Sequence, residues 1–367
     1  PAPPPEPPAV RARIVAVGDL LMHTPLVFSS QAGEDWDFKP LFEPVRPWIA
    51  GADLAYANLE TTLTGKDFPW SGYPSFNTPP ELARDIKTVG WDVVTNANNH
   101  ALDYSEFGLQ KTADHLDQYG MPHTGTFRTA EEREQILVVN VGPAIKMAML
   151  SYTYGTNGVP LPHPWSVNML DPERIRSDIR RARQLPGVDL VAVALHFGDE
   201  YARQPNEEQE RYVQLSLEAG ADIILGDHVH VIQKIEVRQV KDEFGRDLPR
   251  AVIFSLGNFI SNQEGLYKEA GLMLLVDVKK EKGATVVEEV SFIPTWTHPY
   301  TVNGTKHFRV VAVEKALRDY EAKADPLLTA ADYARLKEVW ADTTVQAVGS
   351  PAVKVFHTDL PPALAGR

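Results

Sequence analysis

Short apolar runs alternate with longer amphipathic stretches along most of this chain. The apolar runs have the length of buried strands, and the amphipathic stretches carry apolar residues at helical spacing. This alternation predicts a layered α/β fold, and the close spacing of the later strands predicts hairpins within a mixed sheet. The expected strands are 12–18, 53–58, 91–96, 136–141, 145–152, 189–196, 222–226, 231–238, 251–256, 271–279 and 285–293. The expected helices are 80–89, 105–119, 171–184, 206–219, 311–322 and 329–341.

Polar residues that can bind metals or move protons follow five of these apolar runs. The clearest case is the run 221–225, which leads into a Gly-Asp-His-Val-His stretch at 226–230. In an open α/β sheet the ligand site lies at the carboxyl ends of the strands, so we expect the five polar ends to meet. Together they supply Asp19 and His23, Asn58 and Glu60, Asn99 and His100, His196, and the pair His228 and His230.

Each of these residues also has a plainer explanation when it is taken alone. An Asp that follows a Gly, such as Asp19, is commonly a turn residue, and Glu60 alone would be a surface charge. His196 ends a strongly apolar strand, where a single histidine is often a satisfied core residue. Asn258 closes another strand and fits a turn as well as a pocket. Five strand ends that each supply an oxygen or imidazole donor rarely arise by chance, so the joint pattern favours a site.

The composition limits the classes of function. A formal net charge of -13 argues against nucleic acid as the main partner, although solubility alone explains such a charge. The 367 residues include no Cys, which excludes disulfides and thiolate zinc sites, so any metal must have nitrogen and oxygen ligands. No apolar run approaches the length of about 18 residues that a membrane-spanning helix needs.

We expect three regions along the chain. Residues 1–10 are rich in Pro and form either an extended stalk after a removed signal or anchor, or a disordered end. Residues 11–300 are the predicted catalytic domain, and residues 301–367 form a C-terminal helical extension that packs on the core without chemistry of its own. The stalk interpretation predicts an extracytoplasmic protein, held at the cell surface or the membrane through a segment absent from this chain.

Taken in order, the motifs resemble those of the CapA-type family of poly-γ-glutamate capsule biosynthesis proteins, within the calcineurin-like metallophosphatase superfamily. The matching motifs are Gly18-Asp19 with His23 and the blocks 57–60, 76–80, 99–104, 123–125, 196–201, 228–233 and 255–260. The resemblance implies a four-layer αββα sandwich, in which two mixed β-sheets are flanked by helices. It also implies a two-metal site at the strand ends.

The ligands of this site follow from the same resemblance. The first divalent ion would be held by Asp19, Glu60 and His230, with His23 as a further candidate ligand. The second would be held by Glu60, which bridges the two ions, and by Asn99, His196 and His228. These donor types suit Mn, Fe or Zn without choosing among them. The residues expected to bind substrate or to orient the ligands are Asn58, Asp103, His123, Asp199, Glu200 and Asn258.

Two departures from the superfamily pattern concern the first metal position. The superfamily has Asp and His one residue apart, whereas three residues separate Asp19 from His23. The usual bridging Asp is replaced by Glu60, whose longer side chain can change the spacing of the ions. Both departures resemble variations within the CapA-type branch.

The activity implied by the superfamily is phosphoester hydrolysis, in which an activated water attacks phosphorus and His100 protonates the leaving oxygen. The branch implies a role in making or exporting poly-γ-glutamate. The expected partners are an anionic substrate, either a phosphoester or poly-γ-glutamate, and membrane-bound polyglutamate synthase subunits. A groove for a polyanion could be lined by Arg176, Arg180, Arg181 and Arg183, although a solvated helix face explains these arginines as well.

Two other functions are compatible with the same residues. The chain could be a non-catalytic metal-binding scaffold subunit of a polyglutamate synthesis or export complex. The metals could instead cleave an amide of the polymer. A pure scaffold has no need of His100 beside Asn99, so the complete set of residues favours an enzyme.

Overall fold

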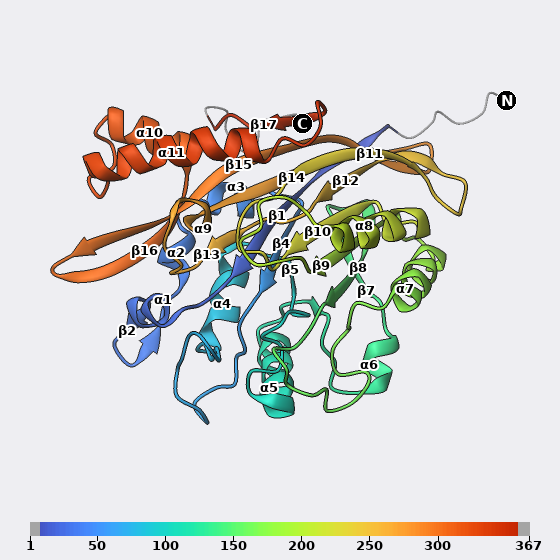
Figure 1. Cartoon of the computed structure of the whole chain (residues 1–367), viewed down its shortest axis with the longest axis horizontal. Helices are drawn as coiled ribbons and strands as arrows, with labels where there is room; N and C mark the ends of the chain where they lie inside the picture. Colours follow the sequence, from blue (N-terminus) through green and yellow to red (C-terminus); the bar gives the residue numbers. More distant parts are fainter. Residues whose placement is uncertain (1–7, 359–367) are drawn as a thin grey trace.

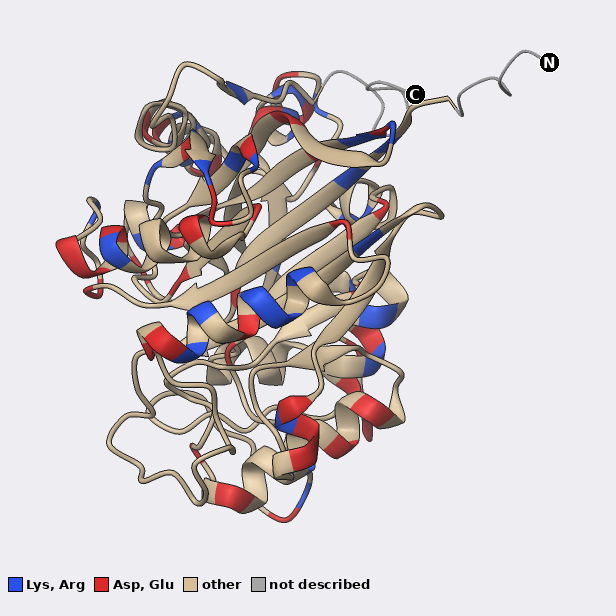
Figure 2. Cartoon of the chain, turned by 90° about the vertical axis from the view of Figure 1, so that its right-hand side faces the viewer, with Lys and Arg blue, Asp and Glu red and all other residues tan. Residues whose placement is uncertain are grey.

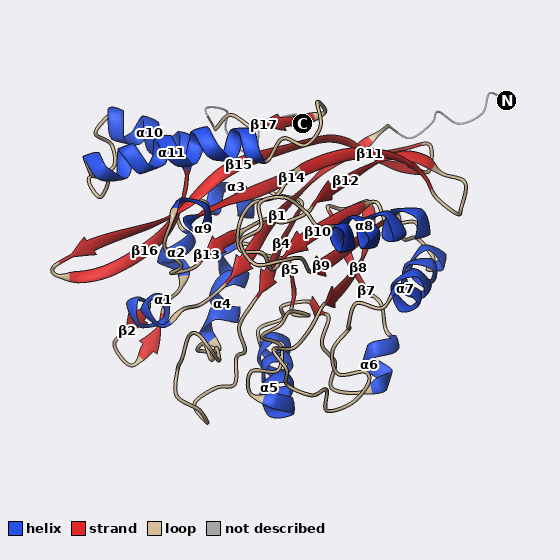
Figure 3. Cartoon of the chain, in the orientation of Figure 1, coloured by secondary structure: helices blue, strands red, loops and turns tan. Residues whose placement is uncertain are grey.

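The computed structural model describes residues 8–358 of the 367-residue chain. Two mixed β-sheets pack face to face, and helices cover their outer faces, as the arrangement of strands and helices in Figure 1 and Figure 3 shows. The predicted α/β sandwich of two mixed sheets flanked by helices is confirmed. No helix within residues 8–358 is long and apolar enough to cross a bilayer.

The larger sheet is organised around β1 (Val10–Leu20), which has a parallel neighbour on one side and an antiparallel neighbour on the other. In spatial order its main strands are β16 (Thr305–Ala312), β15 (Ala284–Val302), β14 (Ala270–Glu281), β1, β4 (Leu54–Leu59), β5 (Val93–Thr95) and β6 (His123–Thr124). Two short strands complete it, because β13 (Asn258–Ile260) pairs with β1 and β17 (Val353–Val355) pairs with β15.

The smaller sheet faces the inner side of the larger one. In spatial order its strands are β11 (Ile235–Lys241), β12 (Asp247–Ile253), β10 (Ile223–Asp227), β9 (Leu190–His196), β8 (Ile145–Thr153) and β7 (Leu137–Val141). A separate two-stranded ribbon consists of β2 (Gln31–Ala32) and β3 (Asp35–Trp36).

Helices form the two outer layers. The outer face of the larger sheet is covered by α1 (Thr24–Ser29), α2 (Lys39–Phe42), α3 (Arg46–Ala50) and α4 (Glu81–Val89). The outer face of the smaller sheet is covered by α7 (Pro172–Gln184) and α8 (Glu207–Ala219). Three further helices lie in connections between strands: α5 (Ser105–Gln118) between β5 and β6, α6 (Ala130–Glu134) between β6 and β7, and α9 (Leu266–Glu269) between β13 and β14.

The alternation of side chains along β1 explains why this strand needs a layer on each side. Ile14 and Ala16 belong to the core between the two sheets, whereas Val15 and Val17 belong to the core beneath the helices. Successive side chains of a strand face opposite sides, so a strand that is apolar at every position is stable only when both faces are covered.

The C-terminal helices α10 (Val313–Glu321) and α11 (Ala330–Gln346) have a different place from the other helices. Leu336 and Val339 of α11 join the core between the sheets, together with Trp296 of β15. The larger sheet has nine strands and the smaller has six, so these helices cover inner-face residues that the smaller sheet leaves open.

The carboxyl ends of the parallel strands lie level with one another in both sheets. Asn58 at the end of β4 is the register partner of Asp19 in β1 and of Thr95 in β5. His196 at the end of β9 is the register partner of Asp227 in β10 and of Thr153 in β8. The expected meeting of polar strand ends therefore has a direct structural basis.

Some elements differ from the sequence-based expectation. The helices α1, α2 and α3 have only 4 to 6 residues, too few for a helical period to show. The segment after residue 300 contains two helices, but it also adds β16 and β17 to the larger sheet. Within the expected leader, residues 1–7 lie outside the described residues, and Val10 already belongs to β1.

The arginines of α7 do not form a cationic groove. Arg176 pairs with Glu173, Arg180 with Glu243, Arg181 with Asp178 and Glu134, and Arg183 with Asp222. Figure 2 shows Lys and Arg interspersed with Asp and Glu on this side of the molecule. These arginines therefore form a helix face on which the charges are paired.

Candidate metal centre

The candidate metal centre lies where the carboxyl ends of the two sheets meet. Asp19 lies near the end of β1, Glu60 follows β4, and His230 follows β10. One ligand atom from each of these three residues lies within 4.8 Å of the other two, and all three side chains are buried. Residues from both sheets therefore supply the donor set expected for the first metal position.

Two glycines let the backbones approach one another beneath this site. A Cβ at Gly18 would lie 1.9 Å from the carbonyl oxygen of Gly257, and a Cβ at Gly226 would lie 2.0 Å from that of Phe254. Neither separation is sterically tolerable, so only glycine fits at both positions. The Gly-Asp pairs 18–19 and 226–227 therefore have the same structural explanation. In each pair the Gly allows close backbone contact at a strand end, directly before a buried Asp.

Glu60 is fully buried, and neither of its carboxylate oxygens has a hydrogen-bond partner among the described residues. Its Oε1 lies 3.7 Å from Nε2 of His196 and 3.9 Å from Nε2 of His230. Burial and the charge of Asp19 raise the pKa of Glu60 well above its usual value. An unpaired buried carboxylate destabilises the fold, and cations between Glu60 and the two imidazoles would remove that penalty.

The donors expected at the second metal position converge on His196. Its Nε2 lies 2.8 Å from Oδ1 of Asn99, and its Nδ1 lies 3.5 Å from Nδ2 of Asn58. Asn58 also donates a hydrogen bond to Oδ1 of Asp19 at 2.8 Å. Asn58 therefore contacts a candidate ligand of each metal position and fixes the separation of Asp19 from His196.

An unusual backbone conformation shapes the turn that carries His228 and His230. Their φ angles are 97° and 60°, in a region that costs a non-glycine residue about 1–3 kcal/mol. The ring of His228 lies 4.8 Å from the ring of His196, measured between centroids, and its buried Nδ1 has no hydrogen-bond partner among residues 8–358. The strained turn places two imidazoles beside the buried carboxylates.

The candidate imidazole ligands are in the form that binds metals. Burial, with a further contribution from His230, lowers the pKa of His228 to about 3. Burial also lowers the pKa of His196 well below its usual value. Both rings are therefore neutral at neutral pH, and a metal ion would not have to displace a proton from either of them.

His100 is oriented by a carboxylate. Its Nδ1 lies 2.8 Å from Oδ2 of Asp103, and that oxygen also accepts the backbone N–H of Phe76 at 2.6 Å. The ring of Phe76 packs edge-on against His100, and the backbone N–H of His100 donates to Oδ1 of Asn98. Because Asp103 takes Nδ1, Nε2 is the nitrogen left to exchange a proton with a substrate.

Asn258 and His23 lie on the side of the first metal position. Oδ1 of Asn258 lies 3.0 Å from Nδ1 of His230. Nδ1 of His23 lies 3.2 Å from the carbonyl oxygen of Leu21 and 3.2 Å from the backbone nitrogen of Asn262. No converging group of three His, Asp or Glu ligand atoms among residues 8–358 includes His23.

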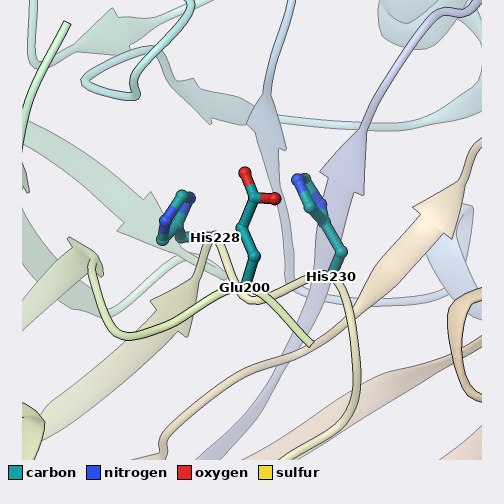
Figure 4. Close-up of side chains that lie close together, drawn as sticks. All are labelled: Glu200, His228 and His230. Atoms are coloured by element: carbon teal, nitrogen blue, oxygen red, sulfur yellow. The ribbon is translucent and has the colours of Figure 1, made fainter. Parts of the chain in front are cut away.

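Three other predicted residues lie outside the buried cluster. Asp199 and Glu200 are exposed on the loop after β9, and Figure 4 shows the carboxylate of Glu200 between the rings of His228 and His230. His123 lies in β6, and its Nε2 is 3.3 Å from Oδ1 of Asp117 in α5. The contact of His123 with α5 gives no support to the substrate-binding or orienting role expected for it.

Three residues of the site were missed by sequence reasoning. Asp227 ends β10, is buried, and has a pKa that burial and the charge of Asp19 raise well above the usual value. The ring of Tyr154 lies 4.3 Å from that of His228, and Asn157 accepts from Nδ2 of Asn99 at 3.1 Å. Tyr154 and Asn157 follow β8, so the rule of polar strand ends, applied to that strand, could have found them.

These residues fit a pair of divalent transition metals. The donors are carboxylates, neutral imidazoles and an amide oxygen, which are nitrogen and oxygen ligands of the borderline type. Both oxygens of Glu60, Oδ1 of Asp227 and Nδ1 of His228 are buried without a hydrogen-bond partner among the described residues. Buried polar atoms are normally satisfied, so this concentration of exceptions indicates a bound group.

The sequence matches the family described as "Bacterial capsule synthesis protein PGA_cap" over residues 13–263. The chain belongs to this family. The matched segment includes every predicted metal ligand and ends before β14 begins. The PGA_cap match therefore covers the candidate ligands, while the strands β14–β17 and the helices α9–α11 lie beyond it.

Two Bacillus proteins are similar to this member of the PGA_cap family. The capsule biosynthesis protein CapA of Bacillus anthracis is 26% identical over 260 residues, which cover 67% of this chain and 59% of that protein. The PGA biosynthesis protein CapA of Bacillus subtilis (strain 168) is 27% identical over 251 residues, which cover 67% of this chain and 62% of that protein. The match therefore spans less than two thirds of each relative.

Among solved structures, the chain is similar to the calcineurin-like phosphoesterase YfkN from Bacillus subtilis. The TM-score is 0.45 at 14% sequence identity, with 92% of this chain and 98% of that chain covered. A TM-score of this size supports no conclusion about activity.

Proposed function

We propose that this chain is a metal-dependent phosphoester hydrolase that takes part in the biosynthesis of a poly-γ-glutamate capsule. The observation that carries the proposal is the environment of Glu60, a fully buried carboxylate without a hydrogen-bond partner among the described residues, beside His196 and His230. Such a group lowers stability unless a cation is bound beside it. We infer that these residues are kept together to bind metal.

The roles of the side chains follow from their contacts. Divalent cations bound here would supply Lewis-acid activation of a water and of a phosphoryl group. His100, held at Nδ1 by Asp103, would donate a proton from Nε2 to the leaving oxygen. Asn58 would keep Asp19 and His196 at a fixed separation. A non-catalytic scaffold would need the metal ligands but not the His100–Asp103 pair.

The proposed substrate is an anionic phosphoester of the capsule pathway, with poly-γ-glutamate itself as the alternative. The names of the relatives, which refer to capsule and PGA biosynthesis, support the biological role. Phosphate esters suit a two-metal centre because paired cations neutralise the charge of the phosphoryl oxygens. The paired arginines of α7 give no support to binding of a long polyanion along that helix.

The proposed place of action is outside the cytoplasmic membrane, because a capsule is an extracellular polymer. The absence of Cys from all 367 residues is compatible with an oxidising environment. Membrane-bound subunits of a polyglutamate synthase are the proposed partners. Recovery of such subunits with the tagged chain, after cross-linking in cells that make the polymer, would test this part of the proposal.

The activity is tested with three small substrates in the presence of Mn²⁺: an aryl phosphate monoester, an aryl phosphodiester and a γ-glutamyl anilide. We expect metal-dependent cleavage of one of the phosphoesters and its loss in His228→Ala. His357→Ala is a matched control, because His357 is exposed and pairs with Glu314 in the C-terminal region. Cleavage of the anilide alone would favour an amidase, and a metal-loaded protein that cleaves none of the three would favour the scaffold.

A further inference from the structure

Glu200 stands on the exposed side of the metal centre, opposite the buried ligands. One of its carboxylate oxygens, a ring nitrogen of His228 and a ring nitrogen of His230 all lie within 4.8 Å of one another. Figure 4 shows the carboxylate between the two imidazoles, with all three side chains directed the same way. This group of donors is additional to Asp19, Glu60 and His230, and the two groups share His230.

The charges around His230 are unbalanced without a cation. Asp19, Glu60 and Glu200 all approach this ring or its neighbour. Within residues 8–358, no Lys or Arg forms an ion pair with any of these three carboxylates. Like charges this close repel one another, and a divalent cation among them converts that repulsion into attraction.

The position of Glu200 is set by its backbone, so the carboxylate is not a freely moving surface group. The backbone N–H of Tyr201 donates to the carbonyl oxygen of Val229, between the two histidines, at 2.7 Å. Nε2 of Gln233 donates to the carbonyl oxygen of Ala202 at 2.8 Å. Both contacts follow Glu200 in the chain, and before it the backbone N–H of Phe197 donates to the carbonyl oxygen of Asp227 at 3.2 Å, so the loop is joined to residues 227–233 on both sides of Glu200.

We propose that Glu200 is a metal ligand that binds from the solvent side the ion held by His228 or His230. Its carboxylate would bind from the exposed side, whereas Glu60 would bind from the buried side. This assignment rests on the proposed metal centre and extends it by one residue, which lies in an exposed loop.

The test is a titration of metal-free protein with Mn²⁺. Calorimetry and the electron paramagnetic resonance signal of free Mn²⁺ monitor the binding. We expect Glu200→Gln, which keeps the shape of the side chain, to weaken one of the two binding steps at least tenfold. The matched control is Glu208→Gln, which makes the same change of side chain and charge on α8. Glu208 is exposed and pairs with Arg211, and it has no place in the metal centre.

The two variants separate the loss of a ligand from a general loss of negative charge. A loss confined to Glu200→Gln, with Glu208→Gln within threefold of the wild type, supports ligation. Unchanged Mn²⁺ binding in Glu200→Gln, or an equal loss in both variants, overturns it. Failure of the wild type to bind Mn²⁺ would instead count against the proposed function, so the two failures are distinguishable.

Discussion

Nδ1 of His230 lies 3.1 Å from Oδ2 of Asp19, although the two residues are 211 positions apart in the chain. Asp19 belongs to the larger sheet, and His230 follows β10 of the smaller one. The candidate metal centre therefore joins the two sheets at their carboxyl ends. A metal bound there should stabilise the packing of one sheet against the other.

Replacement of Glu60 should separate metal binding from intrinsic stability. The pKa of Glu60 in the metal-free fold is raised, so the unfolded chain loses this proton first and stability falls as pH rises above the usual carboxyl pKa. Glu60→Gln should therefore raise the melting temperature of the metal-free protein at neutral pH. It should also abolish the stabilisation by Mn²⁺, which is about 3 kcal/mol for the wild type at 100 times Kd.

Thermal unfolding with and without Mn²⁺ measures both effects. The matched control is Glu338→Gln, which makes the same substitution on the exposed face of α11. A Glu60→Gln protein that is destabilised without metal and still stabilised by Mn²⁺ would show that Glu60 is not a ligand.

Replacement of His100 should reduce catalysis without removing the metals. His100→Ala is expected to lower kcat on the order of 10²- to 10⁴-fold, the usual contribution of a general acid. Asp103→Asn should have a smaller effect, because it removes only the group that orients Nδ1. Metal content, measured on the same samples, should stay at the wild-type value. Loss of metal from His100→Ala would assign His100 to the ligand set instead.

The C-terminal region should control the loop that carries Glu200. Arg203 pairs with Asp342 of α11 at 2.7 Å and stacks over the ring of Tyr267 at 3.9 Å. Nε2 of Gln346 donates to the carbonyl oxygen of Arg203. Asp342→Ala should therefore speed amide hydrogen exchange in residues 198–206 severalfold, as measured by mass spectrometry.

The control for that experiment is another ion pair on the same helix. Glu338→Ala breaks the exposed pair with Arg335 and should leave exchange in 198–206 unchanged. Equal exchange in Asp342→Ala and the wild type would show that α11 packs on the core without holding the loop.

Stability should fall on acidification because of a buried histidine far from the metal centre. His298 is fully buried, its Nδ1 accepts a hydrogen bond from Arg309, and burial lowers its pKa to about 4. The unfolded chain binds this proton from about pH 6.5 downward and the folded chain only near pH 4. The contribution of His298 is therefore complete above pH 6.5 and is lost as pH falls, by up to about 3 kcal/mol.

Urea unfolding at several pH values measures this loss. His298→Gln should be less stable than the wild type at pH 7.5, and its stability should change less between pH 6.5 and 4. Parallel pH dependences for the two proteins would assign the acid sensitivity to other groups.

The meeting of the candidate ligands can be predicted from the sequence because it depends on topology. Parallel strands end at the same edge, so residues after β1, β4, β5, β9 and β10 must meet, whatever the details of packing. Asp227 was missed because only its neighbours His228 and His230 were given roles. The role expected for His123 stays a prediction, and its contact with Asp117 was not foreseeable because it depends on the placement of α5.

Other features were beyond sequence reasoning for physical reasons. The short helices α1–α3 are held by packing on the larger sheet and carry no period of their own. The strand β17 pairs with the long strand β15 at widely separated positions, and such pairing leaves no local signal. By contrast, β16 follows β15 through the turn Asn303-Gly304, a hairpin signal that the sequence does contain. The ion pair between Arg203 and Asp342 joins residues 139 positions apart, so it too appears only in the folded chain.

The most direct test of the central claim is the metal content of the purified protein after exposure to Mn²⁺ and Zn²⁺ and removal of excess metal. Inductively coupled plasma mass spectrometry should find about two transition-metal ions per chain in the wild type. The content should fall in His228→Ala and stay unchanged in His357→Ala. A wild-type protein without bound metal after this treatment would contradict the assignment of these residues as a metal centre.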